Sequence, residues 1–351
     1  MGETARKSFV ASVVAVGVVA VAIAIWQLRV LVALLLLAII IASAMRPGIE
    51  RLYACHVPRG FGVAIHYLGF LLAVGLLLWL IVPRALDQIE TALGTLPTST
   101  SDVAQAARRT HGIKHDILVA IQHRLERLPR GGGAAVTYGR TALEVLVGIF
   151  FTFAVAAYWV FEKERAQTLI LGLVARKRRR VVRDTWDLID EKLGAFVRGQ
   201  LLMMTFVSTV LSVAFWLDGL PYWLLIGVFA GVVEIVPVIG PLAAGVLAVG
   251  AGLTVDWQTA LGAAIAVYGL RLLQDYVVNP RVLGHAVGLS PLVVLVTVTT
   301  VGLLFGGFYV LLATPLAAIL ATLLDVVVLD KNPAAQDVPR LIFPAKEVET
   351  K

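Results

Sequence analysis

The sequence predicts an all-α fold, a polytopic membrane helical bundle of about eight transmembrane helices with broken or re-entrant segments in its C-terminal half. Of the 351 residues, 59% are hydrophobic and only 15% are charged, whereas a soluble domain carries roughly a quarter charged residues. So few charges cannot cover the surface of a soluble protein of this length. Apolar runs of about 20 residues, the length that crosses a bilayer, recur along the chain. The main solvent is therefore expected to be lipid.

Residues 1–82 are predicted to hold transmembrane helices 1 to 3. Phe9–Trp26 and Val30–Met45 are apolar runs joined by a short polar turn, and Phe61–Val82 is the third run. A cleaved signal peptide would resemble the first run, because Ala22-Ile23-Ala24 is an acceptable cleavage site. However, the second run begins at once, which favours a helical hairpin in the membrane.

The rest of the chain alternates between polar and apolar regions. Residues 83–141 contain amphipathic stretches at helical spacing and are predicted to form an extracytoplasmic helical region. Transmembrane helix 4 is expected at 142–161, and a basic cytoplasmic loop with an amphipathic helix at 162–200. The C-terminal transmembrane transport region, with its broken segments, is expected at 201–329. A cytoplasmic tail follows at 330–351.

The positions of Lys and Arg predict the orientation, because basic residues near span ends mark the cytoplasmic side. They precede the first span, follow the second and fill 162–200, so both termini are expected in the cytoplasm of a multi-pass inner (plasma) membrane protein. Residues 222–253 and 291–329 must then each enter and leave on one side, either by crossing twice or by re-entering. The run Arg176–Arg180 is expected to contact anionic lipids rather than nucleic acid.

Glu234 is the strongest candidate for a functional residue. It lies in an apolar stretch of 32 residues, 222–253, that is broken at Glu234-Ile-Val-Pro237 and Gly240-Pro241. Pro237 lacks an amide hydrogen and Gly240 permits an unwound turn, so main-chain carbonyls are freed there. Such carbonyls and a carboxylate together suit a cation or a proton. The alternative is that Glu234 only caps the broken helix.

Further polar groups follow on the next span. Arg271 and Asp275 stand four residues apart and could neutralise each other on one helix face, with Gln274 and Asn279 nearby. A span end that reaches the headgroups is an equally good interpretation of these residues. Asp325 is interpreted as a boundary residue.

The last apolar stretch, 291–329, is expected to break at Gly306, Gly307 and Pro315. Pro241-Leu-Ala-Ala244 recurs there as Pro315-Leu-Ala-Ala318. Paired segments interrupted by Gly and Pro are typical of a transport site between repeats, although a four-residue match in apolar sequence arises easily by chance.

Several enzyme classes lack support. The single cysteine, Cys55, excludes an intramolecular disulfide and a Cys-based zinc site. The phosphate-binding loop of ATPases and the H-E-x-x-H and G-x-S-x-G motifs of hydrolases do not occur in the sequence. We therefore expect a passive or ion-coupled transporter, not an enzyme, with no cofactor and no metal.

Five short segments occur in a recognisable order: Ala157–Glu164, Phe196–Gln200, Glu234–Pro241, Asn279–Gly284 with Val287–Pro291, and Gly306–Phe308 with Thr314–Ala318. Together they resemble the autoinducer-2 exporter family of PerM-type permeases, although Ser290 stands where the family usually has histidine. The resemblance implies export of a small molecule, with the quorum-sensing signal autoinducer-2 as the named substrate. It also implies a homo-oligomer in which a transport unit moves against a scaffold. Some relatives of the family are described as sodium/proton antiporters.

Three hypotheses follow. The first is a secondary transporter that exports a small polar solute. Glu234 would bind H⁺ or a cation such as Na⁺ near mid-membrane, while Arg271, Asp275 and Asn279 would shape the cytoplasmic mouth. The second is a sodium/proton antiporter that uses the same carboxylate. The third is a non-transporting membrane scaffold or assembly factor, for which residues 83–140 and the basic loop are the main arguments.

Overall fold

The computed structural model describes residues 9, 12–14, 16, 17, 20, 23, 24, 26–93, 132–236, 239–278, 290–336 and 338. Over these residues the chain is helical and contains no strand. Pro237, Asn279 and residues 94–131 of the predicted extracytoplasmic region lie outside the described part.

Six of the described helices are long and apolar enough to cross a membrane. They are α2 (Arg29–Ala54), α3 (Arg59–Leu93), α6 (Gly132–Leu173), α7 (Arg179–Leu217), α10 (Trp257–Leu273) and α13 (Gly307–Val327). Shorter apolar helices are α8 (Trp223–Val233), α9 (Ile239–Leu253) and α12 (Pro291–Phe305). The predicted polytopic helical membrane bundle is confirmed.

Three helices continue across boundaries between the segments predicted from the sequence. α6 covers Gly132–Leu173 and so extends beyond the predicted transmembrane helix 4 at both ends. α3 passes through Pro83 and continues to Leu93. α7 unites the amphipathic helix of the basic region with the following apolar span, and a short 3₁₀ helix, η1 (Arg176–Arg178), connects it to α6. The 39 residues of α7 extend over about 58 Å at the helical rise of about 1.5 Å per residue. That is nearly twice the roughly 30 Å thickness of the hydrocarbon core.

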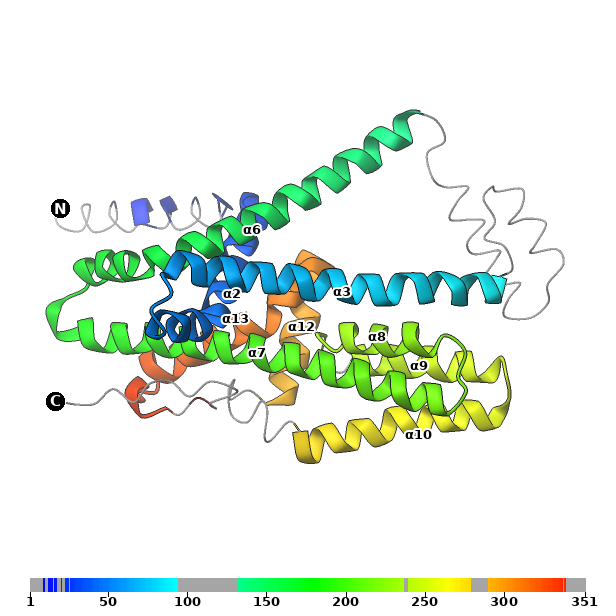
Figure 1. The fold of residues 1–351 in the computed structure, drawn as a ribbon. Coiled ribbons are helices and arrows are strands. Elements are labelled where there is room, and N and C mark those ends of the chain that lie inside the picture. The colour runs from blue at the N-terminus through cyan, green and yellow to red at the C-terminus, as the bar shows by residue number, and fades with distance from the viewer. Residues whose placement is uncertain are drawn as a thin grey trace.

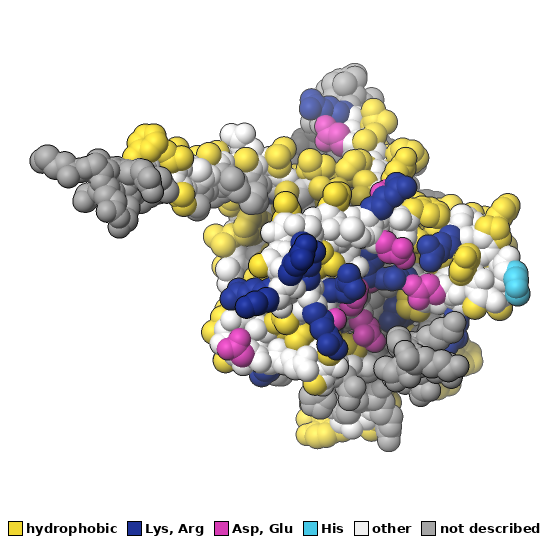
Figure 2. All heavy atoms as spheres, turned by 90° about the vertical axis from the view of Figure 1, so that its left-hand side faces the viewer, with side chains coloured by type: hydrophobic (Ala, Val, Ile, Leu, Met, Phe, Trp, Pro, Cys, Tyr) yellow, Lys and Arg dark blue, Asp and Glu magenta, His cyan; other side chains and the backbone are white. Residues whose placement is uncertain are grey.

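Four turns of the bundle lie at two opposite ends (Figure 1). The α2–α3 turn and the α6–α7 turn lie at one end, and the α7–α8 and α9–α10 turns lie at the other. Figure 2 looks onto the first end, where Lys and Arg side chains surround a few carboxylates. The exposed residues Arg176–Arg180 belong to this end, which we call the basic end.

Two apolar cores share α7. Its C-terminal half packs with α8, α9 and α10, through residues such as Val207, Phe215 and Ala244. Its N-terminal half packs with α2 and α13, where Leu193 meets Ile40 and others. α2 also packs against α6. α7 therefore packs with α8, α9 and α10 through one half and with α2 and α13 through the other.

α8 approaches α7 closely through two glycines four residues apart. A Cβ on Gly227 would overlap Ser212, and a Cβ on Gly231 would overlap Ser208 and the carbonyl of Met204. Small residues at this spacing allow helix backbones to approach in membranes, where packing rather than hydrophobicity drives association. The position of α8 is thereby fixed against one face of α7.

Asp190 of α7 joins three helices near the basic end. Its carboxylate accepts hydrogen bonds from Lys163 Nζ of α6 at 2.6 Å, from Arg46 Nη1 of α2 at 3.2 Å and from the Ser43 hydroxyl. The side chains of Lys163 and Asp190 are only 7% and 12% exposed. A buried carboxylate costs free energy unless it is paired and hydrogen-bonded, and here two cations and a hydroxyl meet that requirement.

The C-terminal segment packs along α7. Lys192 Nζ donates to Gln336 Oε1 at 2.9 Å and to Thr322 Oγ1 of α13 at 3.1 Å. Pro333, in the short helix η3 (Pro333–Ala335), is buried, and Val338 joins a small apolar cluster with α7. The beginning of the predicted tail is thus part of the folded bundle.

At the end opposite the basic end, Asp256 caps α10. Its carboxylate accepts a hydrogen bond from the Thr259 main-chain N–H at 2.7 Å. Because that bond favours the charged form, it lowers the pKa of Asp256. This N-cap fixes where α10 begins after the short turn from α9.

The last apolar stretch breaks once. α12 ends at Phe305, Gly306 adopts a left-handed φ of +99°, and Gly307 begins α13. The expected break at Pro315 is wrong, because α13 continues through this buried proline to Val327. Proline removes one helical hydrogen bond, and membrane helices tolerate this where neighbouring groups satisfy the freed carbonyl.

Candidate functional site

The site is built on a helical hairpin. α8 has 11 residues and α9 has 15 residues. At the rise of an α-helix they extend over about 16 Å and about 22 Å, too little to cross a hydrocarbon core of roughly 30 Å. They run in opposite directions. The start of α8 and the end of α9 both lie at the end opposite the basic end (Figure 1). The break expected between Glu234 and Gly240 is present, and the re-entrant alternative fits these lengths better than two crossings.

The tip of the hairpin is tight. The Val236 amide donates to Val233 O at 2.9 Å, and the Gly240 amide donates to Val236 O at 2.9 Å. A Cβ on Gly240 would overlap the carbonyl of Val233, so only glycine fits where α9 begins. Gly240 therefore allows the backbones of α8 and α9 to approach closely. From the sequence, this glycine is expected only to permit an unwound turn.

Glu234 ends α8 and directs its side chain toward α10. Its Oε1 accepts a hydrogen bond from Gln274 Nε2 at 3.0 Å, and Arg271 Nη1 stands 4.0 Å from the same oxygen. Arg271 Nε lies 3.1 Å from Asp275 Oδ2, so the ion pair expected from the sequence is present. The Glu234 side chain is only 12% exposed. A carboxylate is thus largely buried with a neutral amide as its closest described partner.

Gln200 of α7 holds the main chain at the same position. Its Nε2 donates to Glu234 O at 3.0 Å. The last carbonyls of a helix have no partner within it, so this bond satisfies one of them at the end of α8. Sequence reasoning missed Gln200 as a site residue. The available signal was a glutamine directly before an apolar run, in the segment Phe196–Gln200 that was used only for the family resemblance.

A small cavity lies beside the carboxylate. Its polar lining comes from Glu234, Arg271 and Gln274, and its apolar lining includes Pro241 and Ala244. Its volume is about 10 Å³, and a cavity needs roughly 10–15 Å³ to hold one water molecule. The space therefore suits a single water or a bare monovalent ion. An organic solute does not fit in this conformation.

The lining of the cavity contains one carboxylate, Glu234, and one guanidinium, Arg271. Arg271 Nε lies 3.1 Å from Asp275 Oδ2, whereas Arg271 Nη1 lies 4.0 Å from Glu234 Oε1. Arg271 therefore pairs more closely with Asp275 than with Glu234. A carboxylate held in this way is chemically suited to bind a proton or a monovalent cation.

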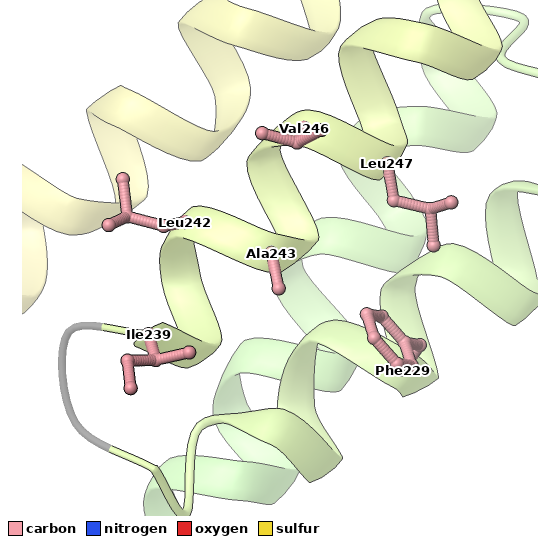
Figure 3. A pocket seen from close by; sticks show the side chains of 6 residues that line it. All are labelled: Phe229, Ile239, Leu242, Ala243, Val246 and Leu247. Carbon is pink, nitrogen blue, oxygen red and sulfur yellow. The ribbon is translucent and has the colours of Figure 1, made fainter. Parts of the chain in front are cut away.

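A second hollow lies between side chains of α8 and α9 (Figure 3). It has a volume of about 480 Å³, and Phe229, Ile239, Leu242, Ala243, Val246 and Leu247 line it. Because all six side chains are apolar, this hollow offers no side-chain group that binds an ion. Of these two spaces, the smaller cavity has the polar side chains that could bind an ion.

The other predicted residues lie elsewhere. Gly306, Gly307 and Pro315 belong to the α12–α13 region and do not line the cavity beside Glu234. Asp325 pairs with Lys331 at 2.7 Å on a partly exposed surface, which fits its interpretation as a boundary residue. Pro237 and Asn279 lie outside the described residues.

Comparison with known proteins identifies the family to which this helical bundle belongs. The sequence profile of the AI-2E family transporters matches residues 16–329, which include the whole hairpin and the Glu234 cavity. The chain belongs to the AI-2E transporter family. The family resemblance and its implication of membrane transport are therefore confirmed.

Three relatives align with this chain over most of both sequences. YrrI of Bacillus subtilis (strain 168), named as a transport protein, is 25% identical over 303 residues, which span 83% of this chain and 84% of the relative. PerM of Escherichia coli (strain K12), named as a permease, is 25% identical over 301 residues, with 83% and 85% covered. YueF of B. subtilis is 24% identical over 289 residues, with 77% of each chain covered.

Proposed function

We propose that this AI-2E family transporter is a secondary transporter that exports a small polar solute, and that Glu234 binds the coupling proton or cation. The observation that carries the proposal is the carboxylate of Glu234, largely buried at the tip of the α8–α9 hairpin beside an ion-sized cavity. Export and an autoinducer-2-like solute are the finer part of the proposal, which the family resemblance implies.

The electrostatics support coupling. A charge within the membrane is costly, and charged groups there mark ion and proton pathways. When Glu234 takes up one proton or one monovalent cation, its own negative charge is neutralised. A neutral group moves within lipid at a lower free-energy cost than a charged one. Solute binding would then require the hairpin to open the small cavity against α7 and α10.

Sodium/proton antiport is the second candidate, and the size of the cavity favours it. The volume of about 10 Å³ is of the order that one water molecule or one small ion needs and leaves no room for an organic molecule. The two candidates share the role of Glu234 and differ in whether an organic solute moves.

The first prediction concerns Glu234→Gln. In liposomes with imposed ion gradients and candidate solutes, this variant should lose roughly tenfold or more of its coupled flux, because a hydrogen-bonded charged partner is worth about 1.5–3 kcal/mol. The matched control is Glu144→Gln, because Glu144 is exposed on α6 and pairs only with Arg140 in the described part of the chain. Full flux in Glu234→Gln would overturn the proposal.

Everted vesicles separate the two candidates. A pH change driven by Na⁺ without organic solute would favour antiport, and its loss in Glu234→Gln would assign it to this carboxylate. Solute flux that collapses with the proton or sodium gradient would favour solute export.

A further inference from the structure

We infer that Gln274 determines the ion specificity of the Glu234 site, by holding the ionised carboxylate with its N–H and by offering its carbonyl oxygen to a bound monovalent cation. This inference rests on the proposed role of Glu234 as the ion-binding carboxylate. It concerns a neutral side chain that the sequence marks only as a polar group near Arg271 and Asp275.

Gln274 is an unusually buried polar residue. It is 3% exposed, at the end of a helix that is otherwise apolar from Leu261 to Leu270. A buried carboxamide costs free energy unless it is hydrogen-bonded. Its Nε2 donates to Glu234 Oε1 at 3.0 Å, so the described partner of this amide is the carboxylate itself.

The backbone changes at the same residue. α10 ends at Leu273, and a π-helix, η2, runs from Gln274 to Val278. π-helical turns are rare in proteins, and those that do occur are often found at functional sites. Here the change places Gln274 in the cavity beside Glu234 while Arg271 still pairs with Asp275.

The chemistry of the carboxamide differs from that of the nearby arginine. A guanidinium only donates hydrogen bonds, whereas a glutamine amide both donates and accepts. When Glu234 is ionised and empty, the amide N–H stabilises it. When Glu234 holds a proton or a cation, a half-turn of the amide presents its oxygen to that proton or cation. Gln274 therefore suits both states of the site, and Arg271 suits only the ionised one.

The cavity provides the space for such a ligand. Its volume is about 10 Å³, and its polar lining is Glu234, Gln274 and Arg271. A space of this order admits one water or one dehydrated ion. Hard cations prefer carboxylate and carbonyl oxygens. Since Arg271 has no oxygen in its side chain, the oxygen of Gln274 is the additional side-chain ligand within this lining.

The test measures cation binding without transport. A ligand that binds the folded state raises the unfolding temperature with its concentration. We would measure thermal unfolding of the purified protein at pH 8 in NaCl, LiCl or KCl, each balanced to constant ionic strength with N-methyl-D-glucamine chloride. The half-maximal Na⁺ concentration and the Na⁺-to-K⁺ ratio are the readouts.

Gln274→Met removes both polar atoms at similar length. It should raise the half-maximal Na⁺ concentration about tenfold or more, as expected for loss of one ligand to a charge. Gln274→Glu adds a second carboxylate and should lower that concentration. The control Gln258→Met lies on the exposed first turn of α10 and should match the unchanged protein. If Gln274→Met does not fold, Gln274→Glu decides, since it keeps the shape and predicts the opposite shift.

The outcomes separate this inference from the proposed function. If Glu234→Gln keeps the Na⁺ response, the ion site of the proposed function is wrong. If Glu234→Gln abolishes the response but Gln274→Met keeps the affinity and the Na⁺-to-K⁺ ratio, the proposed function stands and the role of Gln274 is overturned. Absence of any response of the unchanged protein to Na⁺, Li⁺ and K⁺ also overturns it.

Discussion

At the scale of single residues, the protein stabilises two buried carboxylates by opposite means. Asp190 receives hydrogen bonds from Lys163 and Arg46, so cations surround it. Glu234 receives its closest side-chain bond from the neutral amide of Gln274. Nearby cations favour the charged form of a carboxylate, whereas an amide binds it without requiring a fixed charge. Asp190 is therefore suited to a structural role, and Glu234 to a change of charge during transport.

The second prediction follows for Asp190→Asn. Removal of one member of a buried ion pair leaves a charge uncompensated, so the free energy of unfolding should fall by about 3–5 kcal/mol. Thermal unfolding in detergent measures the loss. The double variant with Lys163→Met should recover part of it, because both buried charges are then absent.

Asp325→Asn is the control for Asp190. The side chain of its partner Lys331 is 54% exposed. Exposed ion pairs contribute only about 0–1 kcal/mol. Equal losses for Asp190→Asn and Asp325→Asn would contradict the structural role of the buried cluster.

At the scale of elements, the hairpin shows what the sequence predicts and what it cannot. The break near Glu234 is visible in the sequence because proline, glycine and a charge interrupt an apolar run. The partners of Glu234 are not visible, because Gln200 and Gln274 lie 34 and 40 residues away along the chain. Only tertiary packing of α7 and α10 against the hairpin brings them together. The same limit explains Pro315, whose tolerance inside α13 depends on surrounding helices.

The third prediction concerns the hairpin tip. Gly240→Ala places a Cβ against the carbonyl of Val233, so the tip must open or shift. Inserting a methyl group into such close packing costs about 1–3 kcal/mol. We expect a lower unfolding temperature together with loss of coupled flux, since the shift moves Glu234 relative to Gln274. Unfolding and liposome flux are measured on the same preparation.

Gly250→Ala is the matched control on the same helix. A Cβ there meets nothing within 4 Å. Alanine is favoured over glycine inside a helix by roughly 0.5–1 kcal/mol. This variant should leave flux unchanged and stability equal or higher. A Gly240→Ala variant that behaves like Gly250→Ala would show that the tip tolerates opening.

At the scale of the whole molecule, charge and topology give one orientation. The α2–α3 and α6–α7 turns share the basic end with the end of α13 (Figure 1), and Lys and Arg side chains gather on this end (Figure 2). The α7–α8 and α9–α10 turns share the other end. Because Lys and Arg are retained in the cytoplasm, the basic end is expected inside the cell. The hairpin would then enter from the extracytoplasmic side, with Glu234 at its deepest point.

The last prediction tests this orientation with the native cysteine. Cys55 is the single cysteine of the chain and is exposed in the α2–α3 turn. A membrane-impermeant maleimide should therefore label it in everted vesicles and not in intact cells. Thr254→Cys in a Cys55→Ser background reports the other end, since Thr254 is exposed in the α9–α10 turn. It should label in intact cells. The reverse pattern would place the basic end outside and would make the hairpin open toward the cytoplasm, which would reverse the side from which the ion reaches Glu234.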